Sequence, residues 1–419
     1  MNAVTSQRIL LTGGRLLDPT DGMDRITDAL VADGRVVAYG ADARALPHDA
    51  VQAIDGCLVL PAFVDLSARL REPGEKHHAT IASETRAALA GGFAHLVLPP
   101  DTRPVTDSPA IVALIQEKAE AARAAKVYPL GALTKGLDGK QPANMAALQQ
   151  AGCIAVSNAR QAFANTETLL RCLEYAATLG LTVFFYPEEP SLSGGCAHDG
   201  FMAARLGLPA MPSVTETVAL ATQLLLVEET GVRAHFSQLS CKGSVELIRI
   251  AKEKGLPVTA DVAMHQLHLT DAAIDGFNSL AHVRPPLRRE ADRLALCAGV
   301  QDGTIDAICS HHQPLNAAAK LAPFPATEPG ISALETVLPL GLKLARDGLL
   351  SEHRLWQALT VAPARVAGIA AGSLTEGGGV TVVDPSASWC VAPETLTSAG
   401  HNTPFLGMAV QGRVRAVFL

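Results

Sequence analysis

The chain has 419 residues and a net charge of −7 at pH 7, and 48% of its residues are hydrophobic while 18% are charged. This balance is typical of a globular protein and excludes a disordered chain. The charge is spread without long runs of one sign, which argues against a nucleic-acid-binding or membrane-surface protein, and no apolar run approaches the roughly 18 residues that cross a bilayer.

The first sixty residues predict short β-strands separated by turns. Three apolar runs lie at residues 9–17, 28–40 and 50–61, and Gly and Asp residues punctuate them. Asp33 and Gly34 divide the second run, and an Asp-Gly pair between two apolar runs indicates a tight β-hairpin turn. We therefore expect a small β-rich unit at this end of the chain.

The middle of the chain alternates between strand-like and helical segments. Helical stretches such as residues 113–126 and 167–180 separate strand-like runs at residues 64–70, 95–100, 126–133, 153–158, 181–187, 233–240, 256–262 and 305–310. Repeated alternation predicts a parallel sheet, and seven or eight units in about 300 residues favour a closed barrel over a doubly wound sheet. No GxGxxG motif follows the first strand, and no Walker A pattern is present.

The end of the chain returns to short strands, at residues 373–393 and 408–419. We predict a (β/α)₈ TIM-type barrel over residues 61–368 and a small β-sandwich domain built from residues 1–60 and 369–419. The eight cysteines are scattered without a CxxC pair, which indicates free thiols in a reducing compartment. The N-terminus lacks a signal-peptide pattern, so we expect a cytoplasmic location.

The first barrel strand presents an unusual pair of residues. Ser67 and Arg69 are two positions apart, so both face the barrel interior, at the strand end where barrels keep their working residues. A His-x-His at this spacing could hold a metal ion, but a serine hydroxyl is a poor zinc ligand and a guanidinium has no lone pair to donate. The charge of Arg69 would repel a dication by several kcal/mol at about 4 Å. The pattern disfavours a metal here.

The other strand ends also lack the His and Asp/Glu set that a hydrolytic metal centre requires. They present Asn158, Tyr186, Gln238 and His311. The adjacent pair His311 and His312 is the strongest candidate for a residual acid or base group.

Several motifs together resemble a dihydroorotase of the amidohydrolase superfamily over nearly the whole chain. They occur in the family's order at residues 70–74 (LREPG), 84–93 (ETRAALAGGF), 131–137 (GALTKGL), 235–249 (HFSQLSCKGSVELIR), 284–288 (RPPLR), 328–336 (EPGISALET) and 402–407 (NTPFLG). So many motifs in one order exclude chance similarity, and the resemblance implies the barrel and terminal β-domain predicted above.

The resemblance also implies which residues have been lost. Active members carry D-x-H-x-H-x-R on the first strand, which here reads Asp65, Ser67, Arg69 and Arg71, so both histidines are replaced and only the substrate-type arginine is kept. The positions of the other metal ligands and of the catalytic aspartate carry Asn158, Tyr186, Gln238 and His311. The resemblance places Asp101 and Arg284 at the positions of two substrate-contacting asparagines. Arg71, the arginine kept on the first strand, and Arg284 are therefore the positions expected to retain any affinity for an anion.

We therefore expect a catalytically inactive dihydroorotase homologue with no metal and no cofactor. Bacterial relatives of this kind build a complex with aspartate carbamoyltransferase, the preceding enzyme of pyrimidine synthesis, so the resemblance implies that partner and a hetero-oligomer, with self-association as a dimer left open. Arg69 is expected to fill the metal pocket and to pair with Asp65, Asp101 or Glu188.

Two alternatives remain open. The first is a divergent cyclic-amide hydrolase, either metal-independent or with a rearranged ligand set from His235, His265, His311 and His312. The second is a ligand-sensing module in which Arg71 and Arg284 bind an anionic pyrimidine without turnover.

Overall fold

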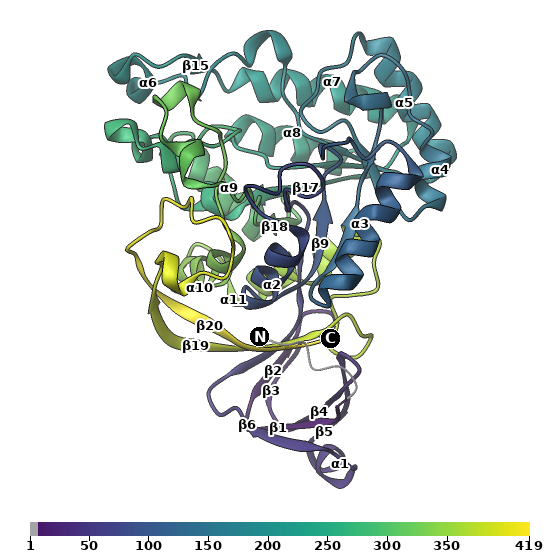
Figure 1. Ribbon diagram of the computed structural model, residues 1–419, viewed down its shortest axis with the longest axis vertical. Helices are drawn as coiled ribbons and strands as arrows, with labels where there is room; N and C mark the ends of the chain where they lie inside the picture. Colours follow the sequence, from purple (N-terminus) through teal and green to yellow (C-terminus); the bar gives the residue numbers. More distant parts are fainter. Residues whose placement is uncertain (1–6) are drawn as a thin grey trace.

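Parallel strands close into a barrel around the middle of the chain in the computed structural model, which describes residues 7–419 (Figure 1). The staves in order are β8 (Phe63–Asp65), β9 (Phe93–Leu98), β10 (Lys126–Pro129) continued by β11 (Gly131–Ala132), β12 (Ala155–Ser157), β13 (Thr182–Phe185), β16 (Ala234–Phe236), β17 (Val258–Ala263) and β18 (Ala307–Cys309). A parallel bridge between Ala68 and His312 joins the last stave to the first. The third stave is divided, since β10 pairs with β9 and β11 pairs with β12.

Helices surround the barrel and pack buried side chains against it. They are α2 (Ile81–Ala90), α3 (Pro109–Ala122), α4 (Met145–Gln150), α5 (Thr166–Thr178), α7 (Val214–Thr230), α8 (Lys242–Glu253), α9 (Glu290–Asp302), α10 (Val337–Arg346), α11 (Glu352–Leu359) and α12 (Val361–Ala367). In α5, Leu169, Cys172, Leu173 and Ala176 are buried, which is the helical spacing of one apolar face. No helix within residues 7–419 is long and apolar enough to cross a membrane.

The start of α2 shows how local sequence fixes these boundaries. The Thr80 hydroxyl accepts from the Ser83 backbone N–H at 3.1 Å, and the Ser83 hydroxyl accepts from the Thr80 N–H at 3.0 Å. This reciprocal capping box satisfies two backbone donors that a helix start would otherwise leave unpaired. It also fixes the direction of α2, which carries the buried Glu84 towards the barrel.

Strands from both ends of the chain form the accessory β-domain. One sheet has the order β20-β19-β7-β2-β3, and the other has the order β5-β4-β1-β6. Their bounds are β1 (Ile9–Thr12), β2 (Arg15–Asp18), β3 (Met23–Ile26), β4 (Ala29–Ala32), β5 (Arg35–Tyr39), β6 (Ala50–Ala53), β7 (Leu58–Pro61), β19 (Val380–Cys390) and β20 (Ala409–Phe418), and α1 (Gly40–Ala45) follows β5. The barrel with a β-sandwich confirms the predicted fold class.

Two details of this domain bear on the sequence predictions. The hairpin at Asp33-Gly34 is confirmed, because Ala32 pairs with Arg35 across the turn. The apolar run at residues 9–17 divides into β1 and β2, which belong to different sheets. Gly13 sits at the division with φ +78°, and a Cβ there would lie 2.3 Å from Asp55 Oδ1, so only glycine fits.

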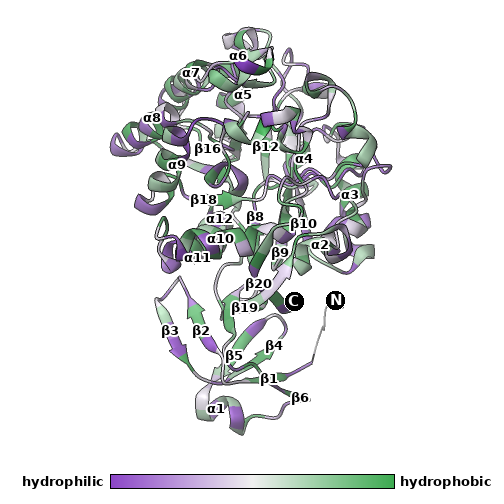
Figure 2. Cartoon of the chain, turned by 90° about the vertical axis from the view of Figure 1, so that its left-hand side faces the viewer, coloured by the Kyte–Doolittle hydropathy of each residue, from purple (hydrophilic) through white to green (hydrophobic). Residues whose placement is uncertain are grey.

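The β-domain and the barrel meet along α10 and β20, and the hydrophobic colouring follows the inner strands while polar residues line the outer helix surfaces (Figure 2). An insertion between β13 and α7 extends from the barrel and contains β14 (Ala197–His198), α6 (Phe201–Leu206) and β15 (Ala210–Met211). This insertion packs its own apolar cluster against residues 274–287 and 324–333.

Candidate functional site

The backbone turns sharply at the carboxyl ends of the barrel strands. Four non-glycine residues there have left-handed backbone angles, namely Arg71 (φ 61°), Ala159 (φ 48°), Gln238 (φ 59°) and His311 (φ 50°). Such angles are uncommon for residues with a Cβ and gather at functional sites. Gln238 and His311 are themselves two of the predicted site residues, so the mouth of the barrel retains the backbone form of a working site.

Ser67, Gln238 and Arg160 form a chain of hydrogen bonds across the barrel mouth. Gln238 Nε2 donates to the Ser67 hydroxyl at 2.8 Å, and Gln238 Oε1 accepts from Arg160 Nη2 at 2.5 Å. The Gln238 backbone N–H donates to Asp261 at 2.7 Å, which holds the residue in place. Two of the residues singled out from the sequence, Ser67 and Gln238, are therefore bonded to each other.

Arg69 follows the first strand and pairs with Asp101. Its Nε and Nη2 lie 3.0 and 2.8 Å from Asp101 Oδ2, and the arginine side chain is 12% exposed. Of the three carboxylates that the sequence offered as partners, the structure selects Asp101. Burial lowers the pKa of Arg69, but the neighbouring Asp101 and Tyr186 outweigh it, so the pKa is raised overall.

Tyr186 and Asn158 occupy the two adjacent strand ends. Burial raises the pKa of Tyr186 to about 12, so its hydroxyl keeps its proton, and the Arg160 guanidinium lies 5.2 Å from the ring centre. Asn158 accepts from the Thr134 hydroxyl at 2.6 Å and donates to the Gln161 carbonyl at 3.0 Å. Asn158 thus joins two loops through one accepted and one donated hydrogen bond.

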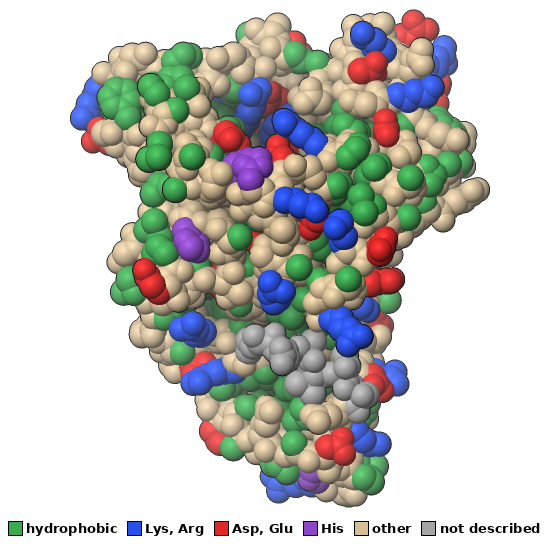
Figure 3. All heavy atoms as spheres, in the orientation of Figure 1, with side chains coloured by type: hydrophobic (Ala, Val, Ile, Leu, Met, Phe, Trp, Pro, Cys, Tyr) green, Lys and Arg blue, Asp and Glu red, His purple; other side chains and the backbone are tan. Residues whose placement is uncertain are grey.

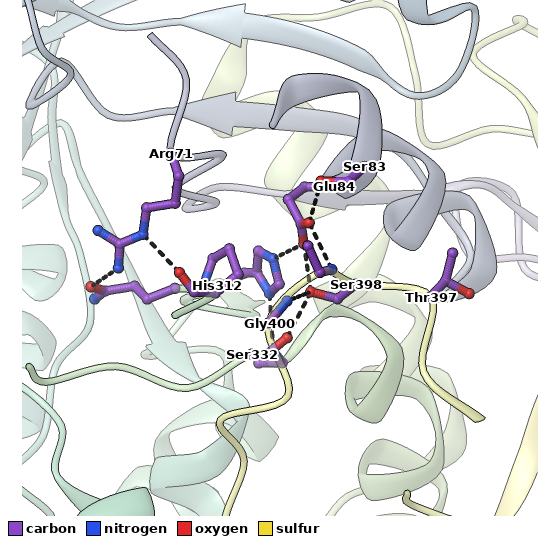
Figure 4. A network of polar contacts seen from close by, with 12 residues as sticks. Arg71, Ser83, Glu84, His312, Ser332, Thr397, Ser398 and Gly400 are labelled. Carbon is purple, nitrogen blue, oxygen red and sulfur yellow. Dashed lines mark hydrogen bonds and ion pairs between the residues drawn. The ribbon is translucent and has the colours of Figure 1, made fainter. Parts of the chain in front are cut away.

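The adjacent histidines His311 and His312 point in different directions. His311 Nε2 lies 2.8 Å from the Gln313 amide nitrogen, and burial followed by His265 and nearby arginines lowers its pKa well below the usual value. His312 Nε2 lies 2.8 Å from Glu84 in a completely buried network that also includes Ser398 and Ser332 (Figure 4). The two rings therefore do not form a joint acid–base pair.

Carboxylates of the chain itself engage the two arginines expected to retain affinity for an anion. Arg71 Nη1 lies 2.9 Å from Glu75, and its Nε donates to the Pro314 carbonyl at 3.0 Å. Arg284 Nε lies 2.9 Å from Glu188, which is a neighbour of Arg160 as well. Both guanidinium groups at the barrel mouth are therefore already paired with carboxylates of the chain.

The remaining histidines do not assemble into a ligand set. His235 Nε2 lies 2.9 Å from Asp261 and its Nδ1 lies 2.8 Å from Thr259 Oγ1, while His265 stacks on His311 with ring centres 5.7 Å apart. Within residues 7–419, no three His, Cys, Asp or Glu side chains are grouped so that they could hold a metal ion. Arg69 and Gln238 offer a guanidinium and an amide at the barrel mouth, and neither group is a suitable zinc ligand.

Two pockets of different volume lie at the barrel mouth, a small one near Arg69 and a larger one beside Arg160. The pocket that Arg69, Arg71 and Asp101 line has a volume of about 20 Å³, close to that of a single water site. A pocket of about 390 Å³ lies between α5 and α7, beside Arg160. On the face in Figure 3, cationic and anionic side chains lie next to each other over the barrel, in keeping with these ion pairs.

Arg160, Asp101 and Glu188 are the site residues whose roles the sequence predictions missed or left open. Arg160 lies two residues after Asn158, but β12 ends at Ser157 and Ala159 has a left-handed backbone angle, so strand alternation does not predict where the Arg160 side chain lies. Its bond to Gln238, which is 78 residues away, could not be read from local spacing.

The chain matches known proteins over nearly its whole length. The family model described as "Dihydro-orotase-like" matches residues 56–244. A "Dihydroorotase-like protein" of Pseudomonas putida is 50% identical over 410 residues, which cover 97% of this chain and 96% of that protein. Its namesake in Pseudomonas aeruginosa is 48% identical, with 97% of each chain covered.

More distant relatives carry different names. A "Dihydroorotase" of a Geobacter species is 40% identical over 410 residues, covering 97% of this chain and 96% of that protein. Among solved structures, the L-hydantoinase (dihydropyrimidinase) of Arthrobacter aurescens has a TM-score of 0.87 at 22% identity, covering 97% of this chain and 93% of that chain. At that identity the likeness shows a shared fold.

Proposed function

Because the chain belongs to the dihydroorotase-like family, we propose that it is a catalytically inactive member that serves as a structural subunit in pyrimidine biosynthesis. The fold of the family is kept in full, whereas the residues at its metal and base positions cannot perform metal-assisted hydrolysis. That chemistry needs a metal-activated water and a carboxylate to move its proton, and the chain offers neither at these positions.

One observation carries this proposal. Arg69 stands where a metal-binding histidine would lie and is bonded to Asp101, at a position where the family contacts its substrate. The ion pair therefore occupies one metal position and one substrate position at once. The Ser67–Gln238 hydrogen bond closes the opposite side. These contacts hold the barrel mouth together with side chains in place of a metal.

The relatives support the same reading. The chain is 48–50% identical to the two proteins named "Dihydroorotase-like protein" and 40–41% identical to several named "Dihydroorotase". The proposal places it with the first group.

The partner that we propose is the catalytic chain of aspartate carbamoyltransferase, in a cytoplasmic hetero-oligomer. The resemblance carries this partner, since inactive bacterial relatives of this kind assemble with that enzyme. A subunit without chemistry is retained most simply when another enzyme depends on it for its assembly.

Co-expression with the carbamoyltransferase chain of the same organism, followed by native mass measurement, tests this proposal. We expect one complex of defined stoichiometry that contains both chains, and separate species would contradict the assembly role. Metal analysis and a dihydroorotate ring-opening assay on the purified chain test the inactive site. Near-stoichiometric zinc, or turnover above background, would instead establish the divergent cyclic-amide hydrolase.

A further inference from the structure

The pocket of about 390 Å³ between α5 and α7 has no part in the proposed function (Figure 1). Its volume is within the range of about 300–1,000 Å³ that small-molecule sites occupy. Its lining residues do not include Ser67 or Arg69 of the first strand, nor Arg71 and Arg284, the two arginines expected to retain affinity for an anion. The pocket is therefore separate from the positions on which the proposed function rests.

Part of the pocket wall is apolar. The buried side chains of Leu133, Leu169, Phe184 and Phe185 line it, and the half-buried Phe163 joins them from the segment before α5. Apolar surface of this kind favours an apolar group over water. A ligand of this pocket is therefore expected to have an apolar part.

Arg160 brings a positive charge to the same lining. Its Nη2 donates to Gln238 Oε1 at 2.5 Å and its Nη1 lies 3.4 Å from Glu188, whereas its Nε has no hydrogen-bond partner within residues 7–419. Burial lowers the pKa of Arg160, and Glu188 raises it only in part because Arg69 and Arg284 act in the opposite direction. The charge of Arg160 is thus incompletely compensated, which favours an anionic group in the pocket.

Two acceptors of the lining lack a matching partner. Glu189 accepts from the Ser191 N–H at 3.3 Å and from the Ser191 hydroxyl at 2.8 Å, and it forms no ion pair with a cationic side chain in the described part of the chain. Gln223 Oε1 on α7 is buried and has no hydrogen-bond partner there. Folded proteins pair nearly all buried polar atoms, and an ammonium group can donate to a carboxylate or to an amide oxygen. These two residues favour a cationic donor in the pocket.

These three features together select a chemical class. A simple carboxylic acid would leave Glu189 and Gln223 without a donor, and a simple amine would leave Arg160 without an anion. An anionic pyrimidine carries no ammonium group either. A molecule with a carboxylate, an ammonium group and an apolar side chain matches the whole lining.

We propose that the pocket between α5 and α7 binds one small zwitterion of the apolar α-amino acid class. Its carboxylate faces Arg160, its ammonium group faces Glu189 and Gln223, and its side chain packs on the apolar wall. Arg160 is bonded to Gln238, which is bonded to Ser67, so the bound molecule lies at one end of the hydrogen-bond chain across the barrel mouth. The proposal does not depend on the carbamoyltransferase partner.

Titration calorimetry on the purified full chain tests the site with L-leucine, L-methionine and L-phenylalanine. At least one of them is expected to bind with a Kd below about 1 mM. Its analogues that lack only the ammonium group or only the carboxylate are expected to bind about tenfold more weakly, because each loses a charge-assisted hydrogen bond. For leucine these analogues are isocaproate and isoamylamine.

Two variants make the test specific. Gln223→Leu removes the unpartnered acceptor, so it is expected to raise the Kd about fivefold or more while the Tm of the free chain stays the same or rises. Gln150→Leu, the same change at an exposed position of α4 outside the pocket, is the matched control and should leave the Kd unchanged. Glu189→Gln is expected to weaken the amino acid but not the analogue that lacks the ammonium group.

The proposal is overturned by any of three results. These are no binding of any of the three amino acids, equal affinity for the amino acid and either analogue, and an unchanged Kd in both pocket variants. None of these results bears on the assembly role, which the co-expression experiment tests by itself.

Discussion

His312 Nε2 donates to Glu84 Oε2 across 2.8 Å, and both side chains are completely buried. The bond joins the end of β18 to α2, and Glu84 also accepts from the Ser398 hydroxyl at 2.6 Å and from the Ala399 N–H at 3.1 Å (Figure 4). One carboxylate therefore connects the barrel wall to the segment that precedes β20, and it lies directly behind the residues of the barrel mouth.

Replacing Glu84 by Gln is expected to destabilise the chain strongly. The amide keeps the shape but removes the charge that His312, Ser398, Ala399 and the Ser83 hydroxyl share, and breaking a buried charged pair typically costs about 3–5 kcal/mol. Thermal unfolding measures the effect as a fall in Tm. Glu120→Gln, at an exposed position of α3, is the control and should leave Tm within error. A Glu84→Gln chain as stable as the parent would show that the network contributes little.

Acid should remove the contribution of Glu84 over a defined range. Burial raises its pKa, but His312 and Ser398 outweigh burial and lower it to about 2, against 4.5 in the unfolded chain. The unfolded state therefore takes up the proton first, so this stabilisation is complete above pH 4.5 and declines as the pH falls from 4.5 towards 2. Denaturation of Glu84→Gln in the same range should lack this component, and parallel curves for the two chains would contradict it.

Protonation of buried histidines should destabilise the folded chain on acidification, over a pH range above that of Glu84. Burial lowers the pKa of His95, His268 and His282 to about 4, from 6.5 in the unfolded chain. The unfolded chain binds these protons first, so stability is greatest above pH 6.5 and falls as the pH drops from 6.5 to 4. We expect Tm to decrease steadily over that interval, and a less steep decrease in His268→Gln. A constant Tm from pH 7 to 4.5 would exclude the effect.

Asp101→Asn should leave Arg69 without its carboxylate partner. The arginine is largely buried, so we expect a loss of about 1–3 kcal/mol, seen as a lower denaturation midpoint. The double variant Arg69→Gln/Asp101→Asn should be less destabilised than the sum of the single variants, because it removes both charges together. Strict additivity in this double-mutant cycle would show that the two residues do not interact.

Restoring the first-strand histidines should not restore a hydrolase. Ser67→His/Arg69→His supplies two imidazoles, but under the proposed function Tyr186 and Gln238 stand at further ligand positions and His311 stands at the position of the base. Metal analysis of this double variant should show well below one zinc per chain, and dihydroorotate opening should remain at background. Tight zinc binding or turnover would mean that the first strand alone controls the site.

More of the fold than of the candidate site could be predicted from the sequence. Alternating helix and strand patterns predict the barrel because each unit reports its own local geometry, and the two-residue spacing predicts that Ser67 and Arg69 lie on one side of the first strand. Partners far apart along the chain were not predictable in this way. Glu84 and His312 are 228 residues apart, and Arg71 and Pro314 are 243 apart, so only the closed barrel brings them together.

The left-handed turns at Arg71, Ala159, Gln238 and His311 have a consequence of their own. Each is expected to store roughly 1–2 kcal/mol of conformational strain, which the packing beneath must sustain whatever the side chains above it do. The backbone conformation at these four positions is therefore independent of the side chains that they carry. A protein engineer could therefore introduce new functional side chains at these four turns without redesigning the backbone of the barrel.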